Sequence, residues 1–118
     1  MKRNPMTKPI YLVRTSVEDQ EKALFISKAL VESHAAVSVH ITEVISTFAW
    51  EGSVDTMNEF EITIICSDPA KVKRIIDNYH TYKLPEFIYI ELNSSEEINK
   101  WCTDWCSKLP KTKNFKER

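Results

Sequence analysis

Residues 37–66 read VSVHITEVISTFAWEGSVDTMNEFEITIIC, and this stretch decides the fold. Apolar and polar residues alternate on both sides of Gly52, the only glycine of the chain, which predicts two strands joined by a hairpin turn at residues 50–53. Each arm has about a dozen residues and would be about 40 Å long if straight. Neighbouring helices cannot cover a hairpin of that length, so its outer part predicts contact with another chain.

The apolar residues of the first arm change phase along the strand. They occupy odd positions up to Ile41 and even positions from Val44 to Phe48. A period of two that shifts by one residue indicates an extra residue in the strand. We therefore expect a β-bulge near Thr42 and Glu43.

Outside the hairpin, strand and helix patterns alternate. They predict a strand at residues 10–13, a helix capped by Ser16 that runs to about His34, a helix after Asp68, a strand at 87–92, and a last helix with a capping box of Ser94 and Glu97. The order β-α-β-β-α-β-α contains the split βαβ arrangement. The fold class is therefore α+β: a ferredoxin-like βαββαβ unit with an antiparallel sheet, a long hairpin and an extra C-terminal helix.

One face of this sheet lacks a predicted cover. Both helices of a ferredoxin-like unit lie on the same face, yet we expect apolar side chains on both sides of the strands, from Tyr11, Val13, Ile65, Phe87 and Tyr89. A solvent-exposed antiparallel face alternates more cleanly than this. We expect other subunits to cover the second face.

Length, composition and charge limit the domain organisation and the classes of function that we expect. The 118 residues fit one domain, with residues 1–8 expected to be a flexible start, 9–109 the domain and 110–118 a charged tail. The net charge of −1 gives no reason to expect nucleic acid, and no apolar run is long enough to cross a membrane. A single glycine excludes the P-loop and the Rossmann fingerprint. Three cysteines and a polar start without a signal peptide predict a cytoplasmic protein.

Four motifs resemble one known family. ALVESHAAV at residues 29–37 is similar to a helix ending of the CutA family, STFAWEG at 46–52 to its Ser-x-Tyr-x-Trp-x-Gly hairpin, and HTYKLPE at 80–86 to its His-Pro-Tyr-x-x-Pro-Glu segment. Trp101 falls where that family has a tryptophan in the last helix. The resemblance covers roughly residues 10–106.

The resemblance implies a homotrimer involved in divalent-cation tolerance and homeostasis, with copper or zinc as the candidate cation, rather than an enzyme. Several positions depart from the family pattern. A first-strand cysteine proposed as a metal ligand is replaced by Arg14, and further departures occur at Val37, Ile65, Cys66 and Thr81.

His80 and Glu86 are the candidate metal ligands. An imidazole and a carboxylate separated by a proline-fixed turn can bind a divalent cation or hydrogen-bond a ligand. The alternative is structural: His80 at a helix C-terminus and Glu86 accepting backbone N–H groups.

Trp50, Glu51, Glu59 and Tyr82 are candidates for a ligand cleft or a subunit interface. Trp50 at the hairpin tip either staples the turn or packs into a neighbouring subunit, which is the interpretation we favour.

The remaining cysteines and histidines receive simpler interpretations. Cys102 and Cys106, one helical turn apart, can present two sulfurs on one face, but packing is favoured. His34 and His40 are expected at the surface or an interface.

Two other function classes stay open. One is a signalling module of the PII type that binds a small ligand between subunits and contacts a protein partner; the other is a structural or anchoring trimer.

Overall fold

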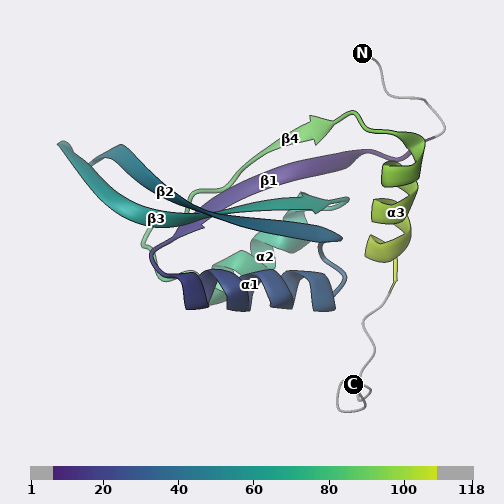
Figure 1. Cartoon of the computed structure of the whole chain (residues 1–118), viewed down its shortest axis with the longest axis horizontal. Coiled ribbons are helices and arrows are strands. Elements are labelled where there is room, and N and C mark those ends of the chain that lie inside the picture. Colours follow the sequence, from purple (N-terminus) through teal and green to yellow (C-terminus); the bar gives the residue numbers. More distant parts are fainter. Residues whose placement is uncertain (1–6, 109–118) are drawn as a thin grey trace, which may run out of the picture.

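The computed structural model describes residues 7–108, so the predictions for residues 1–6 and 109–118 lie outside the described residues. Seven elements follow one another: β1 (Ile10–Val17), α1 (Gln20–Glu32), β2 (Ser38–Trp50), β3 (Ser53–Cys66), α2 (Pro69–Tyr79), β4 (Ile88–Leu92) and α3 (Glu96–Cys106). The strands form an antiparallel sheet in the order β2-β3-β1-β4. Helices α1 and α2 cover one face, α3 stands at one end of the sheet, and the β2–β3 hairpin projects beyond the other end (Figure 1). The predicted ferredoxin-like class with an extra helix is confirmed.

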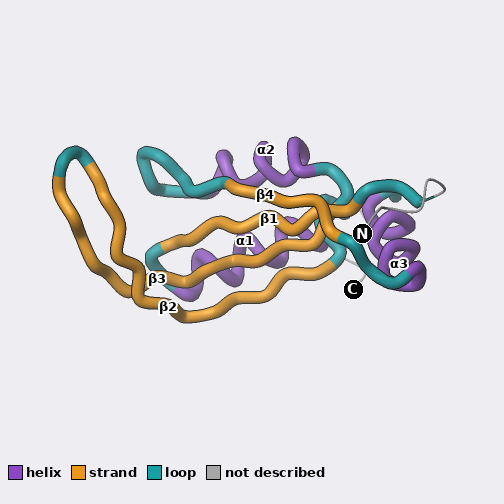
Figure 2. Tube along the Cα trace, turned by 90° about the horizontal axis from the view of Figure 1, so that it is seen from above, coloured by secondary structure: helices purple, strands orange, loops and turns teal. Residues whose placement is uncertain are grey.

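The core lies between the sheet and the helices α1 and α2. From the sheet, Val13, Val17, Ile62 and Ile64 are fully buried, and the helices contribute the predicted stripe together with residues of α2: Ala23, Ile26, Leu30, Val72 and Ile76. Each large apolar side chain buried here stabilises the fold by about 1.5–3 kcal/mol relative to exposure. Seen from above, the hairpin extends past α1 and therefore past this core (Figure 2).

The predicted bulge is wrong. The β2–β3 ladder runs without an extra residue from Ser38 opposite Ile65 to Trp50 opposite Ser53. The phase change has another cause: Val39 and Ile41 pack against the helix-covered core, whereas further out the partly buried residues lie on the opposite face. The covered side of the strand changes, and the register does not.

The first helix begins and ends elsewhere than predicted. Asp19, not Ser16, is its N-cap, and the Asp19 Oδ1 atom accepts a hydrogen bond from the Lys22 amide at 2.7 Å. Ser16 instead remains in β1, which is longer than predicted because Ser16 and Val17 still pair with β3. The helix ends at Glu32, and His34 adopts a left-handed conformation with φ of 65° just beyond its end.

The caps of the other helices are partly as predicted. Asp68 and the proline after it start α2, as expected. Ser95, not Ser94, caps α3, because the Ser95 hydroxyl accepts from the Ile98 amide at 3.2 Å. The predicted apolar stripe of α3 is divided: Cys102 is buried, whereas Ile98 and Trp101 are about half exposed.

The hairpin turn is confirmed and has the geometry of a type I′ turn. Its two central residues, Glu51 and Gly52, both have positive φ, of 49° and 83°. This turn type matches the right-handed twist of the strands that it joins.

The face of the sheet opposite α1 and α2 carries apolar side chains. Leu12 lies between Ile65 of β3 and Ile90 of β4 in the register of the sheet, and Ile88 and Ile90 are 48% and 61% exposed. The aromatic residues that we had assigned to both faces, Tyr11, Phe87 and Tyr89, instead gather on the helix-covered side. None of the helices within residues 7–108 is long and apolar enough to span a membrane.

Candidate functional site

The end of β1 is an irregular point of the sheet. Strand β4 starts at Ile88, opposite Arg14, so the Ser16 carbonyl meets the loop at residues 80–87 instead of a strand. His80, the C-cap of α2, contacts the Ser16 carbonyl oxygen through Nε2 at 2.7 Å. The Tyr82 amide donates to His80 Nδ1 at 3.1 Å, which assigns the proton to Nε2. Both ring nitrogens of His80 are therefore in hydrogen bonds.

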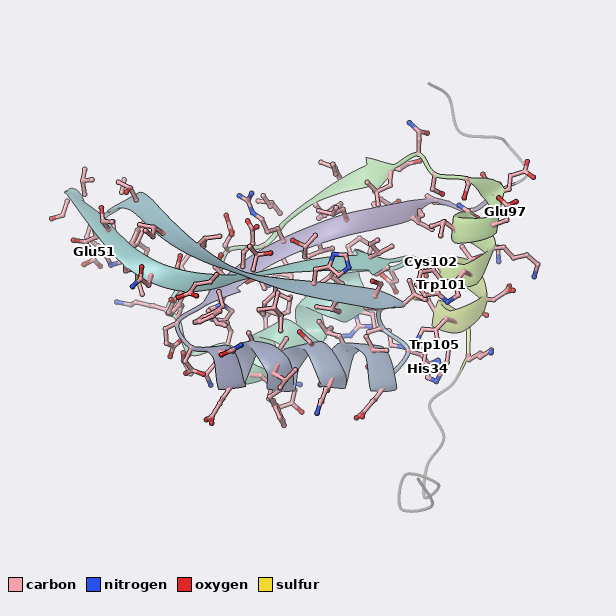
Figure 3. The ribbon with its side chains drawn as sticks, in the orientation of Figure 1. His34, Glu51, Glu97, Trp101, Cys102 and Trp105 are labelled. Atoms are coloured by element: carbon pink, nitrogen blue, oxygen red, sulfur yellow. The ribbon has the colours of Figure 1, made fainter. Side chains whose placement is uncertain are left out.

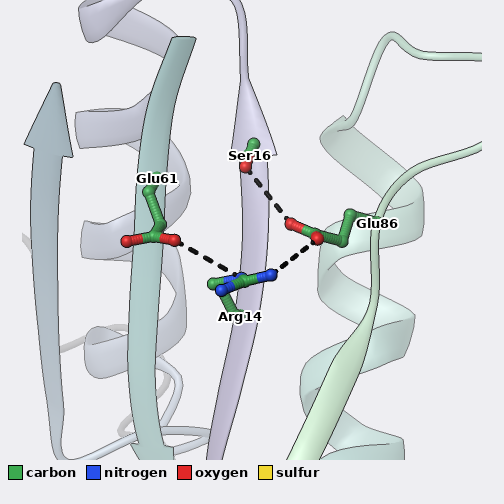
Figure 4. Close-up of polar contacts among 4 residues, drawn as sticks. All are labelled: Arg14, Ser16, Glu61 and Glu86. Atoms are coloured by element: carbon green, nitrogen blue, oxygen red, sulfur yellow. Dashed lines mark hydrogen bonds and ion pairs between the residues drawn. The ribbon is translucent and has the colours of Figure 1, made fainter. Parts of the chain in front are cut away.

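Glu86, at the other end of this loop, also contacts Ser16. Its carboxylate accepts from the Ser16 hydroxyl at 3.3 Å and from Arg14 Nη2 at 3.0 Å (Figure 4). On its other side, Arg14 Nε lies 3.4 Å from a Glu61 carboxylate oxygen of β3. The hydrogen bond to Glu86 and the charge of that carboxylate raise the pKa of Arg14. We call this group of Arg14, Ser16, Glu61, His80 and Glu86 the Ser16 junction.

Glu59 and Tyr82, both predicted site residues, lie together beside the junction. The Tyr82 hydroxyl donates to Glu59 Oε2 at 2.6 Å, and Glu59 is only 7% exposed. Burial and this hydrogen bond raise the pKa of Tyr82. The Tyr82 and His80 rings are 4.8 Å apart, which connects the pair to the junction.

Trp50 and Glu51 are not brought to this site. They lie at the tip of the hairpin, where Trp50 is partly buried and Glu51 is exposed. Figure 3 shows the position of Glu51 at this tip. The predicted set of ligand-cleft residues is thus divided between two places of the fold.

The residues of the junction have the right chemistry for a divalent cation but no ready-made cage. Imidazole and carboxylate are normal ligands of Zn²⁺ and Cu²⁺. However, no three His, Cys, Asp or Glu side chains in the described part of the chain are grouped so that they could hold a metal ion. A cation between His80 and Glu86 has to replace hydrogen bonds that Ser16, Tyr82 and Arg14 now make.

Sequence reasoning missed three members of the junction as site residues. Arg14 had been noted only as a departure, Ser16 had been read as a helix cap, and Glu61 as part of an alternating strand. The side-chain alternation places Arg14 and Glu61 on one face, but only the register of β1 and β3 shows that they are neighbours.

His34 corrects another prediction. It was expected at the surface or an interface, but it is 8% exposed and packs inside its own subunit, where its ring lies 3.8 Å from the Trp105 ring (Figure 3). Its Nδ1 also contacts the Trp105 carbonyl oxygen at 2.9 Å. The cause is the left-handed turn after α1, which directs the imidazole toward α3. His40 is exposed, as predicted.

Comparison with known proteins gives a consistent result. The model of the family described as CutA1 divalent ion tolerance protein matches residues 11–105. A protein of Archaeoglobus fulgidus named divalent-cation tolerance protein CutA is 31% identical over 78 residues, which are 64% of this chain and 74% of that protein.

Solved structures share the fold. The structure of the Archaeoglobus fulgidus periplasmic divalent cation tolerance protein CutA superposes with a TM-score of 0.79 at 24% identity, over 82% of this chain and 98% of the other. The PII-like protein CutA of Nostoc sp. PCC 7120 gives a TM-score of 0.76 at 27% identity, over 81% and 96%.

Proposed function

The chain belongs to the CutA1 divalent ion tolerance family, and from this premise we propose that it acts in divalent-cation tolerance as a homotrimeric binding protein rather than as an enzyme. The proposed cation is Cu²⁺ or Zn²⁺, and the proposed ligands are His80 and Glu86. The observation that supports this choice is that both side chains converge on Ser16, one on its carbonyl oxygen and the other on its hydroxyl.

The present contacts of the junction define how such a cation would compete. Arg14 occupies the Glu86 carboxylate with its own positive charge, and the His80 proton occupies Nε2. A cation bound at Glu86 replaces Arg14 as the positive charge beside this carboxylate. When His80 binds the cation, it gives up its hydrogen bond either to Ser16 or to Tyr82. We therefore expect modest affinity that increases when Arg14 is removed.

Calorimetry of the purified protein with Cu²⁺ and then Zn²⁺ tests the site. His80→Ala and Glu86→Gln should each weaken binding by about tenfold or more, and Arg14→Gln should tighten it. His40→Ala, which changes an exposed histidine, is the matched control and should bind as the unaltered protein does. If His80→Ala binds the cation with unchanged affinity, the assignment of this site is wrong.

The proposed trimer rests on the two uncovered parts of the fold. Ile88 and Ile90 are about half exposed on the open face, and the hairpin extends past the helices (Figure 1). Cyclic symmetry lets each hairpin lie on the next subunit and leaves no free sheet edge. Sedimentation equilibrium should give a mass near three times 13.8 kDa. A stable monomer at micromolar concentration contradicts the proposal.

Substitutions of two tryptophans distinguish an effect on trimer assembly from an effect on the stability of one subunit. Trp50→Ala, at the hairpin tip, should loosen the trimer. Trp105→Ala should mainly destabilise its own subunit, because Trp105 stacks on His34 and its indole N–H donates to the Val31 carbonyl oxygen at 3.2 Å. Sedimentation of both variants, with unfolding followed in urea, distinguishes these effects.

A second candidate is a PII-like module that binds a small ligand and signals to a protein partner. The name of the Nostoc protein, PII-like protein CutA, favours keeping it. Titration with ATP after the metal series tests it: saturable ATP binding without cation binding would replace the first proposal. Because the number of cysteines is odd, we propose that the protein acts in the cytoplasm in either role. The Archaeoglobus fulgidus structure, by contrast, is named as that of a periplasmic protein.

A further inference from the structure

The beginning of α1 and the end of α2 form a shallow pocket that the Ser16 junction does not use. These two helices lie side by side on the covered face of the sheet (Figure 1). The pocket has a volume of about 440 Å³ and is wide open to solvent, and it is lined by Asp19, Glu21, Lys22, Phe25 and Tyr79. The trimer proposed above covers the opposite face of the sheet, so assembly leaves this pocket accessible.

Two aromatic rings form the apolar wall of the pocket. The ring centroids of Phe25 and Tyr79 are 5.0 Å apart and their planes meet at 84°, which is an edge-to-face arrangement. Both side chains stay exposed, by 55% and 39%, and neither belongs to the core. The face of an aromatic ring attracts cations, and within residues 7–108 the cation–π contacts lie elsewhere, at Phe87 and Trp105. The rings of the pocket are therefore available to a cation from outside the chain.

The polar wall of the pocket is acidic. Glu21 and Phe25 are four residues apart on α1, so a carboxylate and a ring share one face of the helix. Asp19 and Glu21 bring two negative charges and Lys22 brings one positive charge, which leaves the lining with a net negative charge. Asp19 also caps α1, and acidic residues stabilise the start of a helix, but that role does not account for the exposed aromatic pair. Carboxylates beside aromatic rings fit a cation that is flat and weakly hydrated.

We propose that this pocket binds an arginine side chain of a partner protein. A guanidinium group is planar, stacks on aromatic rings and pairs with carboxylates, whereas the ammonium group of lysine is strongly hydrated. The exposed Glu21 supplies the carboxylate, and Phe25 and Tyr79 supply the stacking surface. Sites for small molecules bury most of their ligand, whereas a pocket this shallow covers only the end of one side chain. The arginine therefore belongs to a protein segment, and its binding does not depend on a cation at the Ser16 junction.

An NMR titration of the isotope-labelled 118-residue protein tests the proposal. The probe is the tripeptide acetyl-Ala-Arg-Ala-amide, which should bind with a Kd of about 1 mM and shift the amide resonances of Lys22, Phe25 and Tyr79. The same tripeptide with citrulline, which has the shape of arginine without its charge, should shift none of them. The tripeptide with lysine should bind at least about threefold more weakly. Free arginine, whose own carboxylate the acidic wall repels, should also bind more weakly.

Variants of the two walls separate charge from stacking. Glu21→Gln removes a charge, and Phe25→Leu removes a ring but keeps apolar bulk, so each should weaken tripeptide binding by about two- to fivefold. Tyr79→Phe keeps the ring and should retain the affinity. Glu96→Gln is the matched control for Glu21→Gln, because it removes an exposed carboxylate from the first turn of α3. Circular dichroism checks that each variant is folded.

Four results would overturn the proposal: no shifts with the arginine tripeptide, equal binding of the citrulline tripeptide, unchanged affinity in both Glu21→Gln and Phe25→Leu, or tighter binding of free arginine than of the tripeptide. Two further results would replace the partner protein by the chain itself. Shifts of the Phe25 and Tyr79 resonances in Arg118→Gln without added peptide would assign the pocket to residues 109–118. Shifts of the same resonances on dilution of the protein would assign it to a second copy of the chain.

Discussion

Strands β2 and β3 each have one half that the helices cover and one half that projects beyond them, and these two halves have different environments. In the covered half, Ile62 and Ile64 of β3 are fully buried beneath the helices. In the projecting half, Ile45 and Val54 are each 75% exposed, although the ladder between the strands is continuous. The difference teaches that the apolar pattern of a strand reports what covers it, and not only how it is paired.

The boundary between the halves lies where β1 ends. Val17 of β1 pairs with Phe60 of β3. The preceding residue of β3, Glu59, pairs only with Val44 of β2. Tyr82 comes from the loop before β4 and binds Glu59 at this point. The polar pair therefore occupies the place where strand pairing on that side of β3 stops.

Two isoleucines give the largest expected contrast. Ile62→Ala should lower the free energy of unfolding by about 2–5 kcal/mol, because it leaves a cavity in the core. Ile45→Ala, in the projecting half, should cost less than about 1 kcal/mol. Urea denaturation of both variants measures the difference. Equal losses would contradict the division into halves, and a loss at Ile45 that depends on protein concentration would assign it to a contact between chains.

Tyr82→Phe tests the boundary with a smaller expected effect. At neutral pH it removes a hydrogen bond from the buried Glu59 carboxylate and should cost about 1.5–3 kcal/mol.

The same variant should change the response to alkali. Because the pKa of Tyr82 is raised in the folded protein, its stabilising effect is complete below the unfolded tyrosine pKa of about 10 and is lost as the pH rises above it. The unaltered protein should lose stability above that pH more steeply than Tyr82→Phe does. Tyr89→Phe, which changes a half-exposed tyrosine of β4, is the control. The same alkaline slope in Tyr82→Phe and the unaltered protein would show that the Glu59 contact does not hold the proton.

The same contrast explains which predictions from the sequence succeeded. The order of the elements, the hairpin turn and the start of α2 depend on local periodicity and on cap residues, so a single sequence is enough. The bulge failed because the shift at Val44 comes from the end of helix cover, which is a property of the tertiary structure. Ser16 was misassigned because its pairing partner in β3 is far away in the sequence.

For the candidate site, too, local patterns could be read from the sequence and long-range contacts could not. His80 and Glu86 could be proposed as site residues from the sequence because they flank one short loop. Their contacts with Arg14 and Ser16 span 64 to 72 residues of sequence, and therefore required the sheet register. The pairing of Glu59 with Tyr82 likewise depends on where β1 stops, which the sequence had predicted four residues too early.

Gly52→Ala should have the smallest effect and confine it to the projecting half. Gly52 has φ of 83°, and an added Cβ would meet no atom within 4 Å, so the cost is backbone strain alone, about 1 kcal/mol. Gly52→Asn is the matched variant, because asparagine tolerates this conformation better, and it should cost less. Amide hydrogen exchange measures the result residue by residue: exchange should accelerate in the hairpin near Ala49 and Val54, while the amides of Val13 and Ile64 keep their protection. Faster exchange throughout the sheet would mean that the hairpin and the core unfold as one unit, and that the two halves differ in cover but not in local stability.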